Sequence, residues 1–370
     1  MTVFINNHTT KYNGNGFYII DLINNINLDS VKVISLSYKN LKKKKNKRLI
    51  LTDRKKSQSY FGKLLEILFM YYLILKNIKE LKDQTIIFTS DPPIIGLLLV
   101  FIKKITKSKL IFWCQDIFPN TLVVSNNLKQ KSIIFYLLKL INKFIYNNVD
   151  RIVTISKSMK ETLKNEYKVN KNQIEIIENW NSLNLKNRIK LKKKNLNIFY
   201  NGNISIVHDE KFALNFLNQI KNTDLKFKIF TNSNKIKDRP KHVILHKGFL
   251  NEKLFYKSII DSDFQMLFSK SNALKYMYPS KIYNILYYKK PILYFNKDGN
   301  DEICRLLNHY KIGLNVNAKN QNKIIKLFSK TKNIKSLIKL YKNNYKKVSI
   351  FDFKKNNSIN KWKMLLKCAV

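Results

Sequence analysis

The chain has 370 residues and a mass of 44.0 kDa, too long for one ordinary hydrophobic core, which predicts about two domains. Its hydrophobic content of 45% and aromatic content of 12% exclude a disordered chain. The formal net charge of +46 comes almost entirely from lysines spread along the whole sequence. Nucleic-acid binders gather arginine and aromatic residues on one surface, so this pattern argues against that class while favouring anionic partners.

The first half of the chain alternates apolar strands with amphipathic helices. A strand over residues 2–6 leads into a polar loop with Gly14 and Gly16, and then into a helical segment over residues 17–26; the loop does not fit G-x-G-x-x-G. Further strands are predicted over residues 31–38, 85–90, 109–114, 150–155 and 173–177, and helices over 57–81, 94–104, 132–147 and 157–167. Strands that alternate with helices predict a parallel sheet, with ligands bound beyond the carboxyl ends of its strands.

The predicted helix over residues 57–81 has a dense apolar centre at residues 67–75, which is too short to cross a bilayer. A basic segment with Lys42–Lys45, Lys47 and Arg48 precedes it, and we expect a solvated loop there. The helix is either buried in the domain or lies at a bilayer surface beside this loop, and the sequence leaves both interpretations open.

After a polar linker over residues 182–195, the pattern starts again. Strands are predicted over residues 196–200, 226–230, 243–246, 264–268, 291–295 and 313–316, with helices between and after them. We expect an α/β chain of two doubly wound parallel-sheet domains that face each other across a cleft, residues 1–184 and 185–350. Residues 351–370 are predicted to form a helix that packs back on the first domain.

The segment over residues 278–291 contains a helix start with unusual chemistry. Pro279 predicts an extended entry, Ser280 can cap the helix, and Pro291 ends it. A hydroxyl, free backbone N–H groups and the ammonium of Lys281 at a helix start suit a diphosphate, although an ordinary capped surface helix explains the same residues.

Three further observations bear on cofactors and compartment. Cys114, Cys304 and Cys368 lack metal-ligand spacing and cannot all pair, which favours a reducing compartment. The N-terminus lacks the pattern of a signal peptide, so we expect a cytoplasmic protein unless it docks on a membrane surface. Asp261-Ser262-Asp263 matches a metal-binding Asp-x-Asp, but we interpret Asp261 as a helix end and Asp263 as a strand start.

Six short motifs, in one order between about residues 85 and 315, resemble the retaining GT-B-fold glycosyltransferases of family 4. The fucosaminyltransferase-like branch is the nearest in pattern. The motifs are TSDPP at 89–93, QDIFPN at 115–120, DRIVTIS at 150–156, IENW at 177–180, YNGNI at 200–204 and PSKIY at 279–283.

This resemblance implies a GT-B fold of two Rossmann-like domains and a hexosyl- or N-acetylhexosaminyl-type transferase that acts with retention. The implied donor is a nucleotide sugar, with a UDP-sugar expected, and the acceptor is a lipid-linked or free saccharide of polysaccharide, lipopolysaccharide or capsule synthesis. No metal or cofactor is expected, because the nucleotide sugar is a substrate. The N-terminal domain would contact the inner face of the cytoplasmic membrane through its basic and apolar segments, and no nucleic acid is expected to bind.

The resemblance also implies site residues. The catalytic candidates are Asp116 and Lys281. Donor binding is expected from Gly202, Asn203, Ser280, Lys281 and Asn284, and acceptor binding from Gly14, Gly16, Ser90, Asp91 and Gln115. The Gly202 turn would let backbone amides approach the phosphates. His208 is either a further donor-side group or a solvated histidine, and Asp116 either assists deprotonation of the acceptor or caps a turn.

Some positions depart from the family pattern. The two glutamates of the family would fall at Tyr276 and Asn284, and Gln115 replaces the His or Arg of many relatives. Asn284 still offers hydrogen bonds to a ribose, without charge assistance. Two alternatives are therefore a degenerate, non-catalytic subunit and a UDP-sugar 2-epimerase of the same fold, although five scattered histidines argue against the epimerase.

Overall fold

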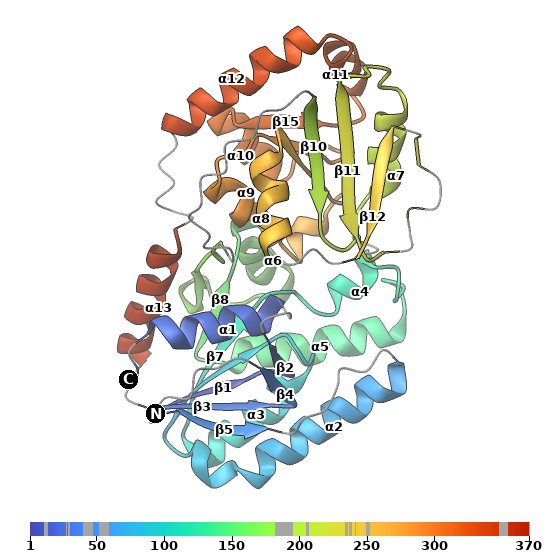
Figure 1. The fold of residues 1–370 in the computed structure, drawn as a ribbon. Helices are drawn as coiled ribbons and strands as arrows, with labels where there is room; N and C mark the ends of the chain where they lie inside the picture. Colours follow the sequence, from blue (N-terminus) through green and yellow to red (C-terminus); the bar gives the residue numbers. More distant parts are fainter. Residues whose placement is uncertain are drawn as a thin grey trace.

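The protein was analysed as a computed structural model that describes residues 1–10, 14–26, 28, 30–39, 47–51, 59–181, 195–204, 207–233, 236, 239–240, 242–248, 252–347 and 354–369. Two α/β domains lie one above the other, and each is built on a parallel sheet (Figure 1). The predicted linker at residues 182–195 and the lysines at 42–45 lie almost wholly outside the described residues. Lys47 and Arg48 belong to a strand, so the expected loop is wrong there.

The first sheet has seven strands in the order β5-β3-β1-β6-β7-β8-β9, all paired in parallel. These strands are β1 (Thr2–Ile5), β3 (Val31–Ser35), β5 (Lys47–Leu51), β6 (Thr85–Thr89), β7 (Lys109–Cys114), β8 (Arg151–Thr154) and β9 (Ile174–Ile176). Its helices are α1 (Gly14–Asn25), α2 (Tyr60–Lys76), α3 (Ile95–Thr106), α4 (Asn120–Val124), α5 (Ile133–Asn148) and α6 (Lys157–Tyr167). A separate parallel pair, β2 (His8–Thr10) with β4 (Ser37–Lys39), occupies part of the expected polar loop.

Both faces of the first sheet are covered, which explains why its strands are continuously apolar. Along β1, Val3 and Ile5 pack against α2, α3 and α5, whereas Phe4 packs in the opposite core with α1. Adjacent residues of a strand point to opposite faces, so one strand supplies both cores. The predicted cap of α6 is confirmed, because Ser156 Oγ accepts a hydrogen bond from Met159 N at 3.2 Å.

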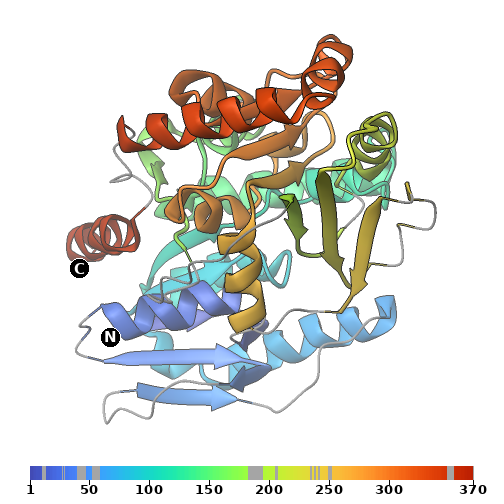
Figure 2. The ribbon, with the colours of Figure 1, turned by 45° about the horizontal axis from the view of Figure 1, so that its top comes forward.

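The second sheet has six parallel strands in the order β12-β11-β10-β13-β14-β15. They are β10 (Leu196–Asn201), β11 (Leu225–Thr231), β12 (Val243–Lys247), β13 (Phe264–Phe268), β14 (Ile292–Phe295) and β15 (Gly313–Val316). The helices of this domain are α7 (Glu210–Asn218), α8 (Glu252–Asp261), α9 (Lys281–Tyr287), α10 (Glu302–Tyr310), α11 (Gln321–Phe328) and α12 (Thr331–Lys347). The strands β10 and β11 point their carboxyl ends toward the first domain (Figures 1 and 2).

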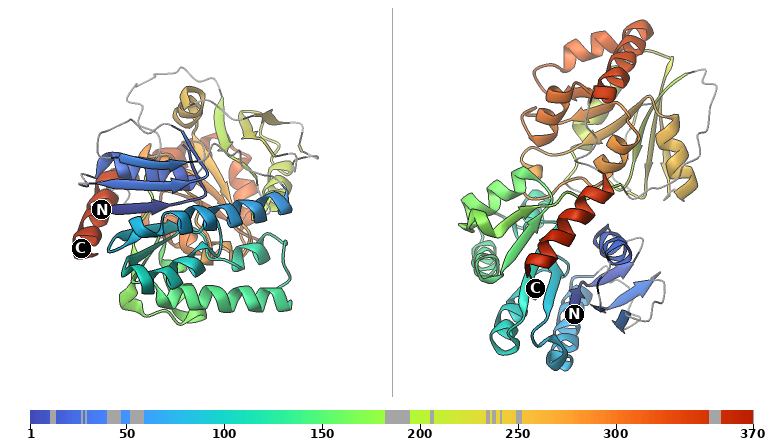
Figure 3. Two further views of the ribbon diagram at one scale, coloured as in Figure 1. Left: turned by 90° about the horizontal axis from the view of Figure 1, so that it is seen from below. Right: turned by 90° about the vertical axis from the view of Figure 1, so that its left-hand side faces the viewer.

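The helix α13 (Lys355–Ala369) follows the second domain in sequence but packs on the first (Figure 3). The Trp362 ring lies 4.6 Å from Trp113, centroid to centroid. Lys361 Nζ pairs with a Glu178 carboxylate oxygen at 2.8 Å and Lys355 Nζ with Asp21 at 2.7 Å. The two-sheet α/β architecture confirms the predicted fold class, whereas the domain boundaries at 184 and 350 stay a prediction.

Direct hydrogen bonds join the two domains. The Glu302 carboxylate, at the start of α10, accepts from the backbone N–H groups of Lys157 at 3.1 Å and Ser158 at 2.8 Å. These amides belong to the first turn of α6, where a carboxylate stabilises the helix end. The Tyr283 hydroxyl donates to Ile155 O at 3.3 Å. The described part of the chain contains no helix that is long and apolar enough to cross a membrane.

Candidate functional site

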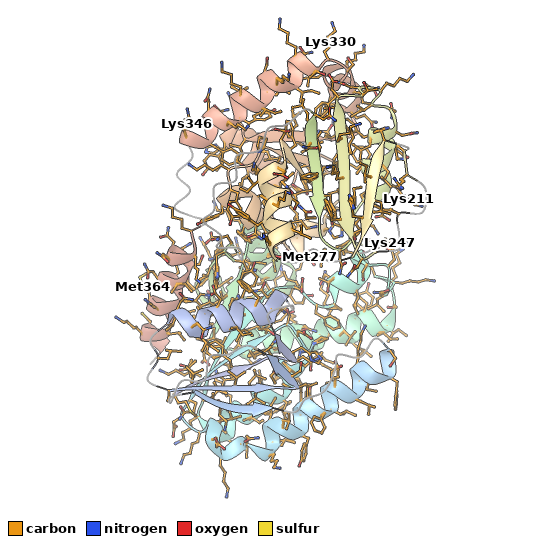
Figure 4. The ribbon with its side chains drawn as sticks, in the orientation of Figure 1. Lys211, Lys247, Met277, Lys330, Lys346 and Met364 are labelled. Atoms are coloured by element: carbon orange, nitrogen blue, oxygen red, sulfur yellow. The ribbon has the colours of Figure 1, made fainter. Side chains whose placement is uncertain are left out.

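A cavity of about 660 Å³ lies between the domains, at the carboxyl ends of both sheets. The first domain contributes Gly14, Tyr18 and Asp116 to its wall. The second domain contributes the carboxyl end of β11, residues that follow β10, β12 and β13, and the start of α9. Figure 4 shows Met277, another wall residue, at the junction between the domains. The topology thus brings polar residues from two open sheets to one site.

Lys281 is the cation of this cavity wall, at the first residue of α9. Its Nζ donates a hydrogen bond of 2.6 Å to the Tyr200 hydroxyl and lies 3.9 Å from the Tyr200 ring centroid. Burial lowers the pKa of Lys281 from 10.5 to about 7. A buried ammonium of this kind gains from an anionic ligand, because the ligand replaces the lost solvation.

The turn after β10 approaches Lys281 closely. Gly202 has a φ of +130°, and a Cβ atom there would lie 3.0 Å from Lys281 Nζ. This backbone conformation favours glycine, and the absence of a Cβ atom leaves room for the Lys281 ammonium. Asn203, the next residue, also lines the cavity and is exposed, so three of the predicted donor residues come together here.

Ser280 and Asn284 complete the predicted donor set, and both line the cavity. Ser280 is exposed, and its side chain makes no capping hydrogen bond, so the expected cap is not formed. The backbone of Ser280 is helical (φ −57°, ψ −24°), which places its hydroxyl away from the cap position. Asn284 lies one turn further along α9 and is buried.

Asp116 follows β7 and presents the one carboxylate among the described residues of the cavity wall. Burial, and next the negative charge of Asp91, raise the pKa of Asp116 from 3.8 to about 6. Its backbone forms an isolated antiparallel bridge with Met277 of the second domain. A carboxyl group with this pKa exchanges protons near neutral pH, which suits a general base.

The predicted acceptor residues are only partly brought to the cavity. Gly14 lines it, but Gly14 and Gly16 open the helix α1, so the expected glycine loop is wrong. Asp91 lies close enough to influence Asp116, and its carbonyl accepts from Asn7 N at 2.8 Å. Ser90 lines a separate cavity of about 10 Å³ beside Pro92, with its Oγ buried and unbonded.

Gln115 is placed away from the cavity wall. It is buried and forms a reciprocal amide pair with Asn179: Asn179 Nδ2 donates to Gln115 Oε1 at 2.8 Å, and Gln115 Nε2 donates to Asn179 Oδ1 at 3.3 Å. Two residues from the ends of β7 and β9 are thereby tied together beneath the site.

The described residues hold no group of three or more His, Cys, Asp or Glu side chains that could bind a metal ion. Asp261 ends α8 and Asp263 precedes β13, as the sequence predicts. The Asp263 carboxylate accepts from Asn197 N at 2.9 Å, so this Asp-x-Asp has a structural role.

Comparisons with known proteins address the family and the fold. Residues 13–183 match the family described as Glycosyltransferase Family 4. A Pseudomonas aeruginosa protein described as "Probable glycosyltransferase WbjE" is 28% identical over 100 residues, which cover 27% of this chain and 24% of that protein.

Several solved structures match over nearly the whole chain, WaaG and Alr3699/HepE among them. WaaG, a glycosyltransferase involved in lipopolysaccharide biosynthesis, gives a TM-score of 0.70 at 9% identity and covers 97% of this chain and 98% of its own. Alr3699/HepE of Anabaena, solved in complex with UDP, gives a TM-score of 0.70 at 9% identity and covers 99% of both chains. The chain has the GT-B fold. At these identities the solved structures show the fold alone, and the family match of residues 13–183 supports a glycosyltransferase.

The GT-B cavity also contains residues that the sequence did not indicate. Tyr18 of α1 lines it, and its hydroxyl donates to Trp180 O at 3.3 Å. Phe230 and Phe255 line it too, and the Phe230 ring stacks on His246 at 4.4 Å between centroids. The end of a predicted strand was the available signal for Phe230, whereas Tyr18 and Phe255 lie within predicted helices, where no local signal marks them.

Proposed function

We propose that this chain is a retaining glycosyltransferase that moves a sugar from a nucleotide-sugar donor, a UDP-sugar first among them, to a lipid-linked or saccharide acceptor. The observation that carries the proposal is the shared cavity, with Lys281 from one domain and Asp116 from the other. The family match over residues 13–183 supports the transferase class. The fucosaminyltransferase-like motifs favour a surface polysaccharide, lipopolysaccharide or capsule as the product, and a hexosyl or N-acetylhexosaminyl group as the sugar transferred.

The donor diphosphate is assigned to the Lys281 end of the cavity. Transfer breaks the bond between the anomeric carbon and the diphosphate oxygen, so negative charge develops on the leaving diphosphate. The Lys281 ammonium, the Ser280 hydroxyl and the backbone beside Gly202 stabilise this charge. The similar fold of a protein solved in complex with UDP supports the same ligand class here.

The nucleoside is assigned to the aromatic end of the same cavity. Phe230 and Phe255 offer apolar faces to a nucleobase, and the Asn284 amide offers hydrogen bonds to a ribose. Because an amide carries no charge, we expect Asn284 to hold the ribose more weakly than a glutamate would.

The acceptor hydroxyl is assigned to the Asp116 side of the cavity. In its ionised form, Asp116 accepts the proton that the hydroxyl loses as the new glycosidic bond forms. Its raised pKa makes the carboxylate a stronger base than an ordinary aspartate while leaving it ionised at neutral pH. Gly14 and Tyr18 form the adjoining wall.

We also propose that the first domain lies on an anionic membrane surface and that the protein is peripheral on the inner face of the cytoplasmic membrane. The helices α2, α3 and α5 lie side by side on one face of the first sheet (Figures 1 and 3). Their outer faces expose large apolar side chains: Phe61, Leu64, Leu65, Leu68, Tyr72, Leu75, Phe101, Ile105, Ile133, Ile134, Tyr136, Leu137, Leu140 and Phe144. A soluble monomer seldom exposes so much contiguous apolar surface.

The charge around this apolar face favours lipid over another protein. The three helices carry six lysines and one carboxylate, Glu66, which is 5% exposed. Lys103 pairs with Asp150 and Lys139 lies near Glu166, but lysines still outnumber carboxylates around this face. This charge fits anionic headgroups, and the apolar side chains fit the boundary of the acyl chains. This placement would bring a lipid-linked acceptor to the cleft.

Titration of the purified protein with UDP, followed by calorimetry, tests the donor assignment. We expect saturable binding with a dissociation constant of about 1 mM or tighter, and no comparable binding of uridine, which lacks the diphosphate. Folded protein that binds neither UDP nor any other nucleoside diphosphate would contradict the proposal. If UDP binds but no sugar is transferred from any donor, the result favours the alternative of a non-catalytic subunit, which the replacement of a glutamate by Asn284 suggested.

The epimerase alternative is less well supported by the cavity. Of the five histidines, His208 lines it, and Asp116 is the one carboxylate of its described wall. Proton removal and return at a sugar carbon would call for more acid–base groups than these two.

A further inference from the structure

The segment Tyr276–Tyr278 crosses from the second domain into the first. Tyr276 and Tyr278 pack against the apolar core that α2, α3, α5 and α6 form with the sheet of the first domain. Met277, between them, lines the cavity and forms the bridge with Asp116. Tyr278 lines the cavity as well, so the segment lies between the cavity and the core of the first domain.

Two hydrogen bonds fix this segment to the first domain. Ile117 N donates to Tyr276 O at 2.7 Å, directly after Asp116 in sequence. The Tyr276 hydroxyl donates to Glu166 Oε1 at 3.1 Å, near the end of α6. The backbone and the side chain of Tyr276 are thus both held by the acceptor side of the cleft.

Glu166 also contacts the segment that carries Asp116. Its Oε2 accepts from Asn120 Nδ2 at 3.1 Å, and Asn120 lies four residues after Asp116. Lys139 Nζ lies 3.8 Å from the same carboxylate oxygen. One carboxylate therefore holds both the segment that carries Asp116 and the segment that leads to Lys281.

We infer that Tyr276 is a positioning residue, which sets the separation between Asp116 in one domain and the Lys281 end of the cavity in the other. Tyr276 is not among the described residues of the cavity wall, so it acts through its neighbours rather than on substrate. Four residues separate it from Lys281, which is the first residue of α9. The inference rests on the proposed transferase function, because only a transfer between two substrates needs this separation to be fixed.

The resemblance expects a glutamate at this position, whereas Tyr276 directs its hydroxyl away from the cavity and into the other domain. A longer, aromatic side chain both reaches Glu166 and fills apolar space against the core of the first domain. This position therefore has an interdomain role here in place of a contact with the donor.

The test compares Tyr276→Phe, which deletes one hydroxyl, with Tyr310→Phe at the far end of α10 as the matched control. UDP serves as the probe for binding, and the donor found in a transfer screen serves for rates. We expect kcat of Tyr276→Phe to fall about tenfold, since reacting groups lose rate when they are misplaced by a fraction of an ångström. The KM for the donor, the Kd for UDP and the melting temperature should match those of the control.

A double-mutant cycle with Glu166→Ala assigns the effect to this hydrogen bond. In the Glu166→Ala background, Tyr276→Phe should change kcat by less than about twofold, because the partner is already lost. Should Glu166→Ala fail to fold, Glu166→Gln takes its place. Additive losses, an unchanged kcat in Tyr276→Phe, or an equal loss of UDP affinity would overturn the inference.

Hydrogen exchange gives a readout that does not depend on turnover. In Tyr276→Phe, exchange of the Ile117 amide should quicken together with that of residues 276–278 and 280–281, whereas Tyr310→Phe should leave both unchanged. Unchanged exchange would overturn the inference. If the exchange rates rise as expected but the wild-type protein transfers no sugar, the proposed function fails and the link between the two segments stands.

Discussion

The ammonium of Lys281 donates a hydrogen bond of 2.6 Å to the hydroxyl of Tyr200 and lies over its ring. The Tyr200 hydroxyl in turn donates to Asn203 O at 3.0 Å, in the turn after β10. The Tyr200 ring is stacked on Phe268 at 4.2 Å between centroids. Tyr200 therefore holds Lys281 at the cavity without supplying a negative charge. The positive charge of the ammonium remains available to a ligand.

Replacement of Lys281 by methionine should remove most of the diphosphate binding. We expect UDP affinity to fall by about tenfold or more and the transfer rate by about a hundredfold, because the ammonium faces a charge that grows in the transition state. Lys281→Arg should recover only part of this loss, since a planar guanidinium does not fit the space beside Gly202. Equal UDP affinity in wild type and Lys281→Met, measured by calorimetry, would show that Lys281 does not bind the diphosphate.

The same substitution should stabilise the fold without ligand. The folded-state pKa of Lys281 is lowered from 10.5 to about 7, so folding opposes protonation of this amine. The cost is fully present below pH 7 and fades as pH rises to the unfolded value. Lys281→Met should therefore melt at a higher temperature than wild type at pH 6, and the difference should shrink toward pH 10. A difference that grows with pH would contradict the lowered pKa.

The pH dependence of transfer should be a narrow bell. Activity needs Asp116 ionised, above its pKa of about 6, and Lys281 protonated, below its pKa of about 7, in the free enzyme. The profile of kcat/KM should thus be greatest between these values. Because the charge of Asp91 contributes to the raised pKa of Asp116, Asp91→Asn should move the acidic limb to lower pH and leave the basic limb in place.

That comparison has a built-in control. Lys281→Arg should remove the basic limb in the neutral range while it keeps the acidic limb, because a guanidinium stays protonated there. An acidic limb that stays fixed in Asp91→Asn would mean that another group than Asp116 sets it.

Gly202→Ala should damage donor binding through Lys281. A Cβ at this position meets the Lys281 ammonium at 3.0 Å, and the φ of +130° is strained for alanine. We expect a loss of about 1–3 kcal/mol in unfolding free energy from the backbone alone. Gly248→Ala is the matched control for backbone strain: Gly248 lines the same cavity with a φ of +117°, but its added Cβ has no atom within 4 Å. Only Gly202→Ala should also weaken UDP binding. Equal UDP affinity in the two variants would contradict the predicted contact between the added Cβ atom and Lys281.

The apolar face formed by α2, α3 and α5 should bind anionic vesicles. The double variant Leu68→Asp with Leu137→Asp should lower cosedimentation with phosphatidylglycerol vesicles by about tenfold or more, because it places charges in the contact. Both side chains are more than half exposed, so folding should be unaffected. Leu340→Asp on α12 is the control and should bind like wild type. Vesicle binding that the double variant retains, or self-association in place of vesicle binding, would contradict a membrane role.

The sequence predicted the fold because its signals are local. Alternating apolar runs mark the strands of both sheets, and Ser156 caps α6 as its position predicts. Local sequence patterns failed where tertiary packing determines the structure. Gly14 and Gly16 predicted a loop, but they begin α1, because the apolar residues that follow them pack on the first sheet.

The candidate site likewise contains residues that local sequence patterns predicted and residues that only tertiary contacts reveal. Lys281, Gly202 and Asp116 sit at the ends of predicted elements, and the structure brings all three to one cavity. Gln115 has the same signal but pairs with Asn179, a partner 64 residues away that no local pattern indicates. The role inferred for Tyr276 likewise depends on Glu166 in the other domain, so only the folded chain reveals it.

The most direct measurement is a donor screen with the purified protein on acceptor-bearing vesicles, with mass detection of the product. The proposal predicts that one nucleotide sugar gives an acceptor heavier by one sugar residue, with release of one nucleoside diphosphate per transfer, and that Lys281→Met abolishes both signals. Folded protein that gives neither product nor nucleotide with any donor would contradict the transferase assignment.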